Sequence, residues 1–73
     1  MDTSAVALNI VYKLQESGID TKDAARQLNV TNETFSRWIR GARMPTAYAL
    51  YRMAQMFDCT MEELMEGCEG KNV

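Results

Sequence analysis

The sequence predicts an all-α fold, a compact bundle of four to five short helices in a single domain. The chain has 73 residues, of which 47% are hydrophobic and 25% charged, as in ordinary soluble globular domains. Apolar residues recur at helical spacing, capping residues and glycines interrupt the chain at short intervals, and no run alternates as a half-buried strand does. A domain of this size buries only about 60% of the surface of its unfolded chain, which leaves little room for a catalytic cleft.

The first expected helix runs from Thr3 or Ser4 to Glu16 and stops at Gly18. Its apolar side chains recur along one helix face, at Val6, Ile10, Val11 and Leu14. The second expected helix covers residues 21–28.

A tight turn joins the second helix to the third. Asp20 is the expected N-cap of the second helix, and Asp23, three residues later, resembles the reciprocal half of a capping box. Asn29 lies in the turn "LNVT", where the backbone needs a residue that tolerates positive φ. Because Ala25 is small, it allows the two helix backbones to approach closely. Two short helices joined by a tight turn are therefore expected.

The third expected helix, residues 32–40, begins at the N-cap Thr31 and ends at Gly41. At about 100° per residue, Phe35, Trp38 and Ile39 form an apolar wall, and Trp38 is expected in the core. The opposite wall is polar and carries Asn32, Glu33, Ser36, Arg37 and Arg40. Periodicity alone favours an ordinary surface helix with a solvated outer face.

The fourth expected helix covers residues 47–57 behind the N-cap Thr46, and Pro45 separates it from the third. The fifth begins at a capping box made by Thr60 and Glu63. It closes at Gly67.

The five helices are expected to form one domain over residues 1–67, followed by a short flexible tail, residues 68–73. The two cysteines lie nine positions apart and match no metal-binding spacing. We expect Cys59 to fill a small space in the core and Cys68 to be a free thiol, with no disulfide between them.

The formal net charge of −2 conceals a gradient along the chain. Residues 1–17 carry −1, residues 18–45 carry +2 and residues 46–73 carry −3. The only net-positive third contains the second and third helices, so the acidic end can face away from a polyanion.

Composition also excludes several classes of protein. The chain has no histidine, no Gly-rich phosphate loop and no cysteine beside a base, so we expect no enzyme, no metal and no other cofactor. No apolar run approaches the roughly 18 residues that span a bilayer, and the acidic start does not resemble a signal peptide. The expected location is the cytoplasm.

Residues 17–46, "SGIDTKDAARQLNVTNETFSRWIRGARMPT", resemble the helix-turn-helix of the phage Cro/lambda-repressor family, the XRE-type regulators. The resemblance extends over about residues 6–67. It departs from the family pattern at the turn, where Asn29 replaces Gly, at Thr21, which replaces Gln, and at Ile39, which replaces Glu. It is carried in order by Ile19, Ala25, Leu28, Val30, Thr31, Phe35, Ser36, Trp38, Gly41, Pro45 and Thr46.

The resemblance implies a sequence-specific double-stranded DNA-binding transcriptional regulator, a small repressor of phage or bacterial origin with no further domain. In this family the third helix enters the major groove. Two sets of residues carry over by position. The expected base contacts are Asn32, Glu33 and Arg37. The expected phosphate contacts are Thr21, Thr31, Ser36, Arg40 and Arg43.

The role of Glu33 stays open between two interpretations. Its carboxylate accepts a hydrogen bond from cytosine, or it orients Arg37 one helical turn later.

The C-terminal half contains many apolar side chains: Tyr48, Tyr51, Met53, Met56, Phe57, Met61, Leu64 and Met65. Most of them are expected in the core. An exposed remainder on the last two helices would suit a homodimer on a palindromic operator. The alternative function is a protein-interaction module, an antirepressor or adaptor, that keeps the bundle without using DNA. No small-molecule ligand is implied.

Overall fold

The computed structural model describes residues 3–66, which form five α-helices and no strand. The helices are α1 (Thr3–Ser17), α2 (Thr21–Leu28), α3 (Asn32–Ile39), α4 (Ala47–Phe57) and α5 (Met61–Met65). The all-α prediction is confirmed. The expected bounds of the second and fourth helices agree with α2 and α4, while α1 ends one residue later than expected and α3 one residue earlier.

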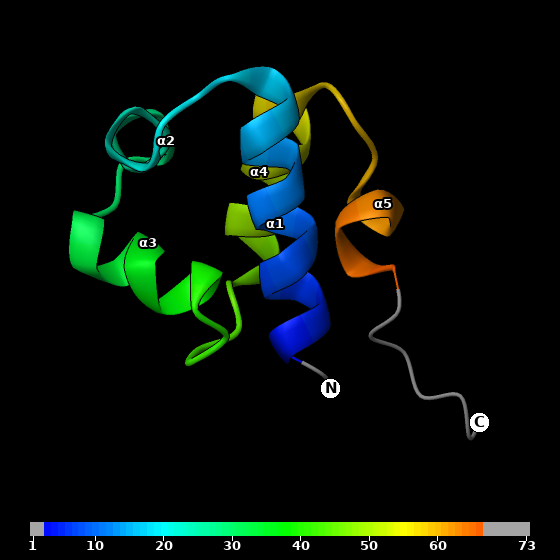
Figure 1. The fold of residues 1–73 in the computed structure, drawn as a ribbon, viewed down its shortest axis with the longest axis horizontal. Helices are drawn as coiled ribbons and strands as arrows, with labels where there is room; N and C mark the ends of the chain where they lie inside the picture. The colour runs from blue at the N-terminus through cyan, green and yellow to red at the C-terminus, as the bar shows by residue number, and fades with distance from the viewer. Residues whose placement is uncertain (1–2, 67–73) are drawn as a thin grey trace.

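The helices are arranged around α1 and α4, which cross at the centre of the molecule (Figure 1). The pair α2 and α3 lies on one side of them, and the short α5 lies on the opposite side. Helix α1 packs against α3, α4 and α5, so it joins the two sides of the bundle.

Four helices begin at a side chain that accepts a hydrogen bond from the backbone N–H three residues later. The cap distances are 2.8 Å at Asp20, 3.1 Å at Thr31, 3.0 Å at Thr46 and 3.1 Å at Thr60. These bonds satisfy amides that have no partner inside the helix, which explains why the helix starts were predictable. The reciprocal role expected for Asp23 was wrong, because its carboxylate accepts a hydrogen bond from Arg26 instead.

Helix α1 stops at Gly18, which has a φ of 75°. Three further helices end at a residue in the left-handed conformation: Asn29 with φ 59° after α2, Gly41 with φ 77° after α3, and Asp58 with φ 55° after α4. In each case the next amide donates to a carbonyl five residues earlier, the hydrogen bond of a Schellman motif. The left-handed turn at Asn29 was expected, whereas that at Asp58 was not.

The core draws on all five helices. Its largest fully buried side chains are Val6 and Ile10 of α1, Phe35 of α3, Met53 of α4 and Leu64 of α5. Helix α2 contributes Ala24, Ala25 and Leu28. Cys59 is partly buried against this core as expected, whereas Cys68, Gly67 and the predicted tail lie outside the described residues.

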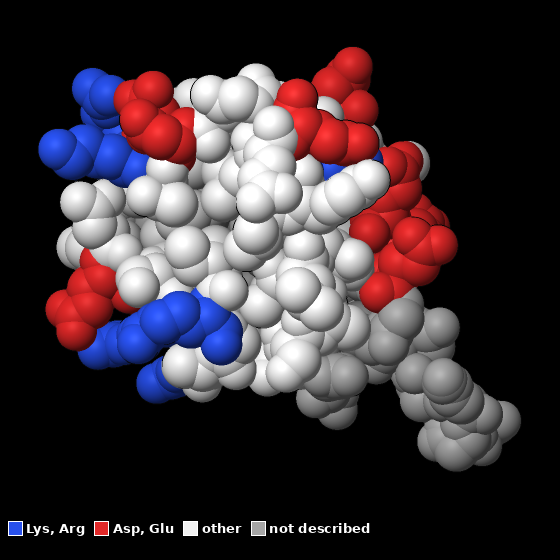
Figure 2. All heavy atoms as spheres, in the orientation of Figure 1, with Lys and Arg blue, Asp and Glu red and all other residues white. Residues whose placement is uncertain are grey.

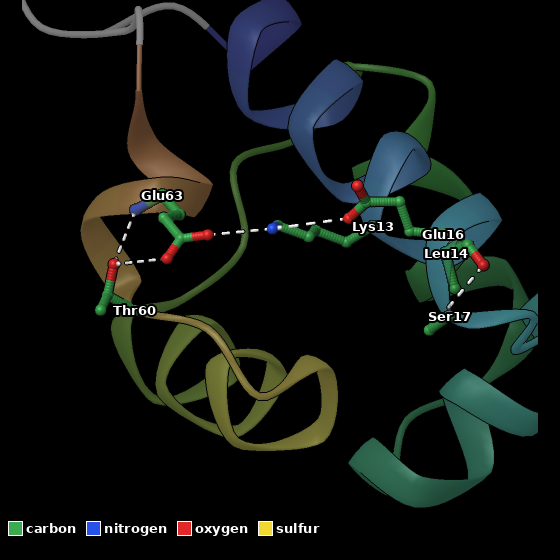
Figure 3. Close-up of polar contacts among 6 residues, drawn as sticks. All are labelled: Lys13, Leu14, Glu16, Ser17, Thr60 and Glu63. Carbon is green, nitrogen blue, oxygen red and sulfur yellow. Dashed lines mark hydrogen bonds and ion pairs between the residues drawn. The ribbon is translucent and has the colours of Figure 1, made fainter.

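Side chains of α1 hold α5 in place. The Asn9 Nδ2 group donates to the carbonyl oxygens of Leu64 and Glu66, each at 2.9 Å, and Lys13 Nζ lies 2.9 Å from Glu63 Oε1 (Figure 3). The Lys13 hydrogen bond and the Thr60 backbone amide lower the pKa of Glu63, and the same contact with Glu63 raises the pKa of Lys13. The capping box at Thr60 therefore also takes part in a contact between two helices.

Candidate nucleic-acid interface

Helix α3 is divided into a buried wall and an exposed wall. The Phe35 and Trp38 side chains are 1% and 5% exposed, and their rings pack edge to face with centroids 6.2 Å apart. Trp38 is thus a core residue as expected, and Ile39 is partly buried against the same core. The apolar wall fixes the rotation of α3, so its polar wall faces solvent.

Both ends of α3 are fixed. At its start the tight turn through Asn29 sets its approach to α2, and the Thr31 cap closes the first turn. At its end the Ala42 amide donates to the Arg37 carbonyl at 2.9 Å, and the Thr3 hydroxyl of α1 donates to the Gly41 carbonyl at 2.8 Å. The polar wall of α3 is therefore held at a defined orientation by α1 and α2.

The three expected base-contacting residues share this exposed wall. Asn32, Glu33 and Arg37 are all exposed. An Arg37 Nη2 group donates to Glu33 Oε2 at 2.9 Å, so Glu33 orients Arg37 in the protein alone. Because the two groups lie one turn apart on the same helix face, they form a single polar unit.

The expected phosphate-contacting residues surround this wall. Thr21 is exposed at the start of α2, and Arg40 and Arg43 are exposed at the end of α3 and in the loop that follows it. Ser36 is half-buried, and its carbonyl accepts a hydrogen bond from Arg40 Nε at 3.2 Å. The Thr31 hydroxyl accepts from the Thr34 amide and donates to the Thr34 hydroxyl at 3.0 Å. Its hydrogen is already used inside the chain.

Charge is distributed unevenly between the two sides of the molecule (Figure 2). Lys and Arg gather on the side of α2 and α3, with some acidic groups among them, whereas acidic groups dominate the side of α5. An uncharged band over α1 separates the two sides. On this face of the molecule, the charge gradient seen along the sequence is also a separation in space.

The sequence profile of the helix-turn-helix family matches residues 10–64, which is more than half of the chain. The chain belongs to this family, in its XRE, lambda-repressor-like type. It is accordingly a DNA-binding regulator of the XRE type. Neither the curated proteins nor the solved structures gave a significant match.

The helix-turn-helix has two basic residues that sequence reasoning left without a role. Lys22 and Arg26 of α2 line a shallow surface hollow together with Asn32 at the start of α3. Both side chains are exposed, and Arg26 pairs with Asp23. Their spacing of four residues, which puts both on one face of α2, was a signal available in the sequence.

Residues 3–66, which the structure describes, contain no group of three or more His, Cys, Asp or Glu side chains that could hold a metal ion. Over the same residues, no helix is both long and apolar enough to cross a membrane.

Proposed function

We propose that the protein is a sequence-specific double-stranded DNA-binding transcriptional regulator, a small repressor of phage or bacterial origin that acts in the cytoplasm. The observation that carries the proposal is the division of α3. Phe35 and Trp38 anchor one wall in the core, so the side chains of Asn32, Glu33 and Arg37 are left available on the other. In this proposal α3 enters the major groove with that wall facing the base edges.

The three side chains have the chemistry for base readout. An asparagine amide pairs bidentately with adenine, and an arginine guanidinium pairs with the O6 and N7 atoms of guanine. Asn32 and Arg37 take these roles. The ion pair with Arg37 supports the orienting role of Glu33 in the protein alone, and its free carboxylate oxygen is available to accept from a cytosine amino group.

The proposed phosphate contacts come from both ends of α3 and from the start of α2. Arg40 and Arg43 supply charge after α3, and Thr21 supplies a hydroxyl at the start of α2. Ser36 supplies a further hydroxyl. The Thr31 hydroxyl already bonds to Thr34, so at this end of α3 a phosphate is bound by the free backbone amides of the first helical turn.

We further propose a homodimer on a palindromic operator, with the contact on α4. Tyr48 and Tyr51 are 66% and 50% exposed there, with ring centroids 6.4 Å apart. Glu62 and Glu63 of α5 and Glu66 directly after it are exposed, and like charges would repel each other across a two-fold axis. The tyrosine pair is thus the part of the C-terminal helices assigned to the contact.

Sedimentation equilibrium tests the dimer. We expect the wild type to dimerise in the micromolar range and the Tyr48→Ala/Tyr51→Ala variant to be monomeric. The matched control is Leu8→Ala/Tyr12→Ala, which removes the exposed apolar pair of α1 and leaves the dimer intact. A wild type that stays monomeric at high micromolar concentration contradicts this part of the proposal.

A second candidate is a protein-interaction module that keeps the bundle without using DNA, such as an antirepressor or adaptor. The net charge of −2 and the exposed Leu8 and Tyr12 favour it. The two candidates differ in whether the protein binds duplex DNA. Neither candidate includes a catalytic step, a cofactor or a small-molecule ligand.

Selection from a random duplex library separates them. We expect enrichment of one operator, with an affinity that falls steeply as salt rises because phosphate contacts release counterions. Arg37→Ala weakens binding to the selected operator, and Arg40→Ala weakens binding to all duplexes and reduces the salt slope by about 1. Absence of enrichment at low salt contradicts DNA binding and favours the interaction module.

A further inference from the structure

Glu33 and Arg37 form an exposed ion pair on the outer wall of α3. The Glu33 side chain is 74% exposed and the Arg37 side chain 46%, and their closest charged atoms are 2.9 Å apart. Neither group touches another element through a hydrogen bond, so the pair connects nothing in the fold. Exposed pairs of this kind contribute little to stability. The fold gains little from an acidic residue at this position, namely this exposed pair and the modest benefit of a carboxylate in the first turn of a helix.

Electrostatics makes the same position costly for duplex binding. Glu33 is the only acidic residue of α3, and it lies on the wall that contains Arg37 and Asn32. A carboxylate brought close to phosphates is repelled by them and loses its hydration. Binding to any duplex is weaker for this reason, unless the DNA supplies a hydrogen-bond donor at the carboxylate.

The hydrogen-bonding groups that remain free on Arg37 and Glu33 match those of a G·C base pair. Arg37 has five N–H donors and gives one to Glu33, so enough remain to bond both O6 and N7 of guanine. Glu33 uses Oε2 for Arg37, and Oε1 is free to accept from the N4 amino group of cytosine. A·T pairs present a donor at adenine N6 where the guanidinium requires an acceptor.

We propose that Glu33 and Arg37 act as one recognition unit for a G·C base pair, with Glu33 as the specificity-determining residue. Arg37 supplies attraction to guanine, and Glu33 lowers the affinity for every duplex that offers no cytosine amino group at the same step. This inference rests on the proposed function, because it requires α3 to lie in the major groove.

The test compares Glu33→Gln with wild type on the selected operator and on random duplex, at one salt concentration. Glu62→Gln is the matched control, because it removes the same charge from an exposed position on α5. We expect Glu33→Gln to bind random duplex more tightly and to lose roughly tenfold in its preference for the operator. Glu62→Gln leaves that preference unchanged, and circular dichroism verifies that both variants stay folded.

A second selection, performed with Glu33→Gln, locates the effect. We expect the G·C requirement to relax at the same base pair at which Arg37→Ala relaxes it. The inference is overturned if Glu33→Gln keeps the operator preference of the wild type, or if it weakens all duplexes equally. Wild-type protein that binds no duplex is a different result, which refutes the proposed function itself.

Discussion

Helices α3 and α5 lie on opposite sides of the bundle and use their polar side chains in opposite ways. On the outer wall of α3 the hydrogen bonds remain within the helix, from Arg37 to Glu33 and from Arg40 to Ser36. On α5 the polar groups bond across to α1, through Asn9 and through the Lys13–Glu63 pair.

The difference follows from how each helix is anchored. Helix α3 has eight residues and buries two aromatic side chains, whereas α5 has five residues and fully buries only Leu64. Because apolar packing holds α3, its polar wall is free for a partner. Helix α5 buries less apolar surface, so its attachment to α1 also depends on the hydrogen bonds of its polar groups.

The largest expected effect tests the aromatic anchor of α3. Phe35→Ala deletes a side chain that is 1% exposed, and we expect it to lower the free energy of unfolding by about 3–5 kcal/mol. Urea denaturation measures this change. Tyr12→Ala, on an exposed aromatic residue of α1 outside the proposed dimer contact, is the control and stays within about 0.5 kcal/mol of wild type. Equal losses for both variants would show that the wall is not held by burial.

The next prediction concerns the free wall. Arg37→Ala is expected to weaken binding to the selected operator by about 1–3 kcal/mol. The same substitution changes the free energy of unfolding by no more than about 0.5 kcal/mol, because the ion pair it breaks is exposed. Fluorescence anisotropy and urea denaturation measure the two quantities. A variant that loses stability and affinity together would indicate that Arg37 is structural.

On the other side of the bundle, Asn9→Ala removes two hydrogen bonds to α5. We expect a loss of about 1–2 kcal/mol in the free energy of unfolding, because the carbonyls of Leu64 and Glu66 lose their donor. Operator affinity is unchanged. Gln15→Ala, an exposed residue of α1, is the control. A large drop in operator affinity for Asn9→Ala would mean that the two sides are coupled.

The smallest expected effect is the pH dependence of the Lys13–Glu63 contact. Since the pKa of Glu63 is lowered in the folded state, its contribution is present above the unfolded carboxyl pKa of about 4.3 and is lost as pH falls through the folded value. The raised pKa of Lys13 implies a contribution that is lost only at high pH.

Thermal unfolding of wild type and Glu63→Gln, measured from about pH 7 down to about pH 3, checks this behaviour. The variant is less stable at neutral pH, and the difference disappears in acid. Glutamine keeps a side-chain acceptor for the Thr60 amide, so the comparison isolates the charge. A difference that persists at the lowest pH would contradict the assignment.

Local signals made most of the fold predictable. Each N-cap acts within three residues, and the apolar wall of α3 follows from helical spacing, so Asp20, Thr31 and Trp38 were assigned correctly. The attachment of α5 was not predictable, because Asn9 and its acceptors are separated by more than 50 residues and no periodicity connects them.

Two further features were not predicted from the sequence. Asp58 adopts the left-handed conformation that glycine usually supplies, so no glycine marks the end of α4 in the sequence. Lys22 and Arg26 are separated from Asn32 by the turn, and only the packing of α2 on α3 brings them to one hollow. The candidate site was predictable as a helix face, and the spacing of Lys22 and Arg26 placed them on one face of α2, but their position beside Asn32 was not predictable.

The outer wall of α3 is the surface proposed to read duplex DNA. The most direct test of this role is a titration of wild type with the selected operator and with a scrambled duplex of the same composition, at one salt concentration. We expect a preference of about 10³-fold or more for the operator, and we expect Arg37→Ala to reduce the discrimination between bases at a single position of the operator. Equal affinity for the two duplexes, or binding to neither, would contradict it.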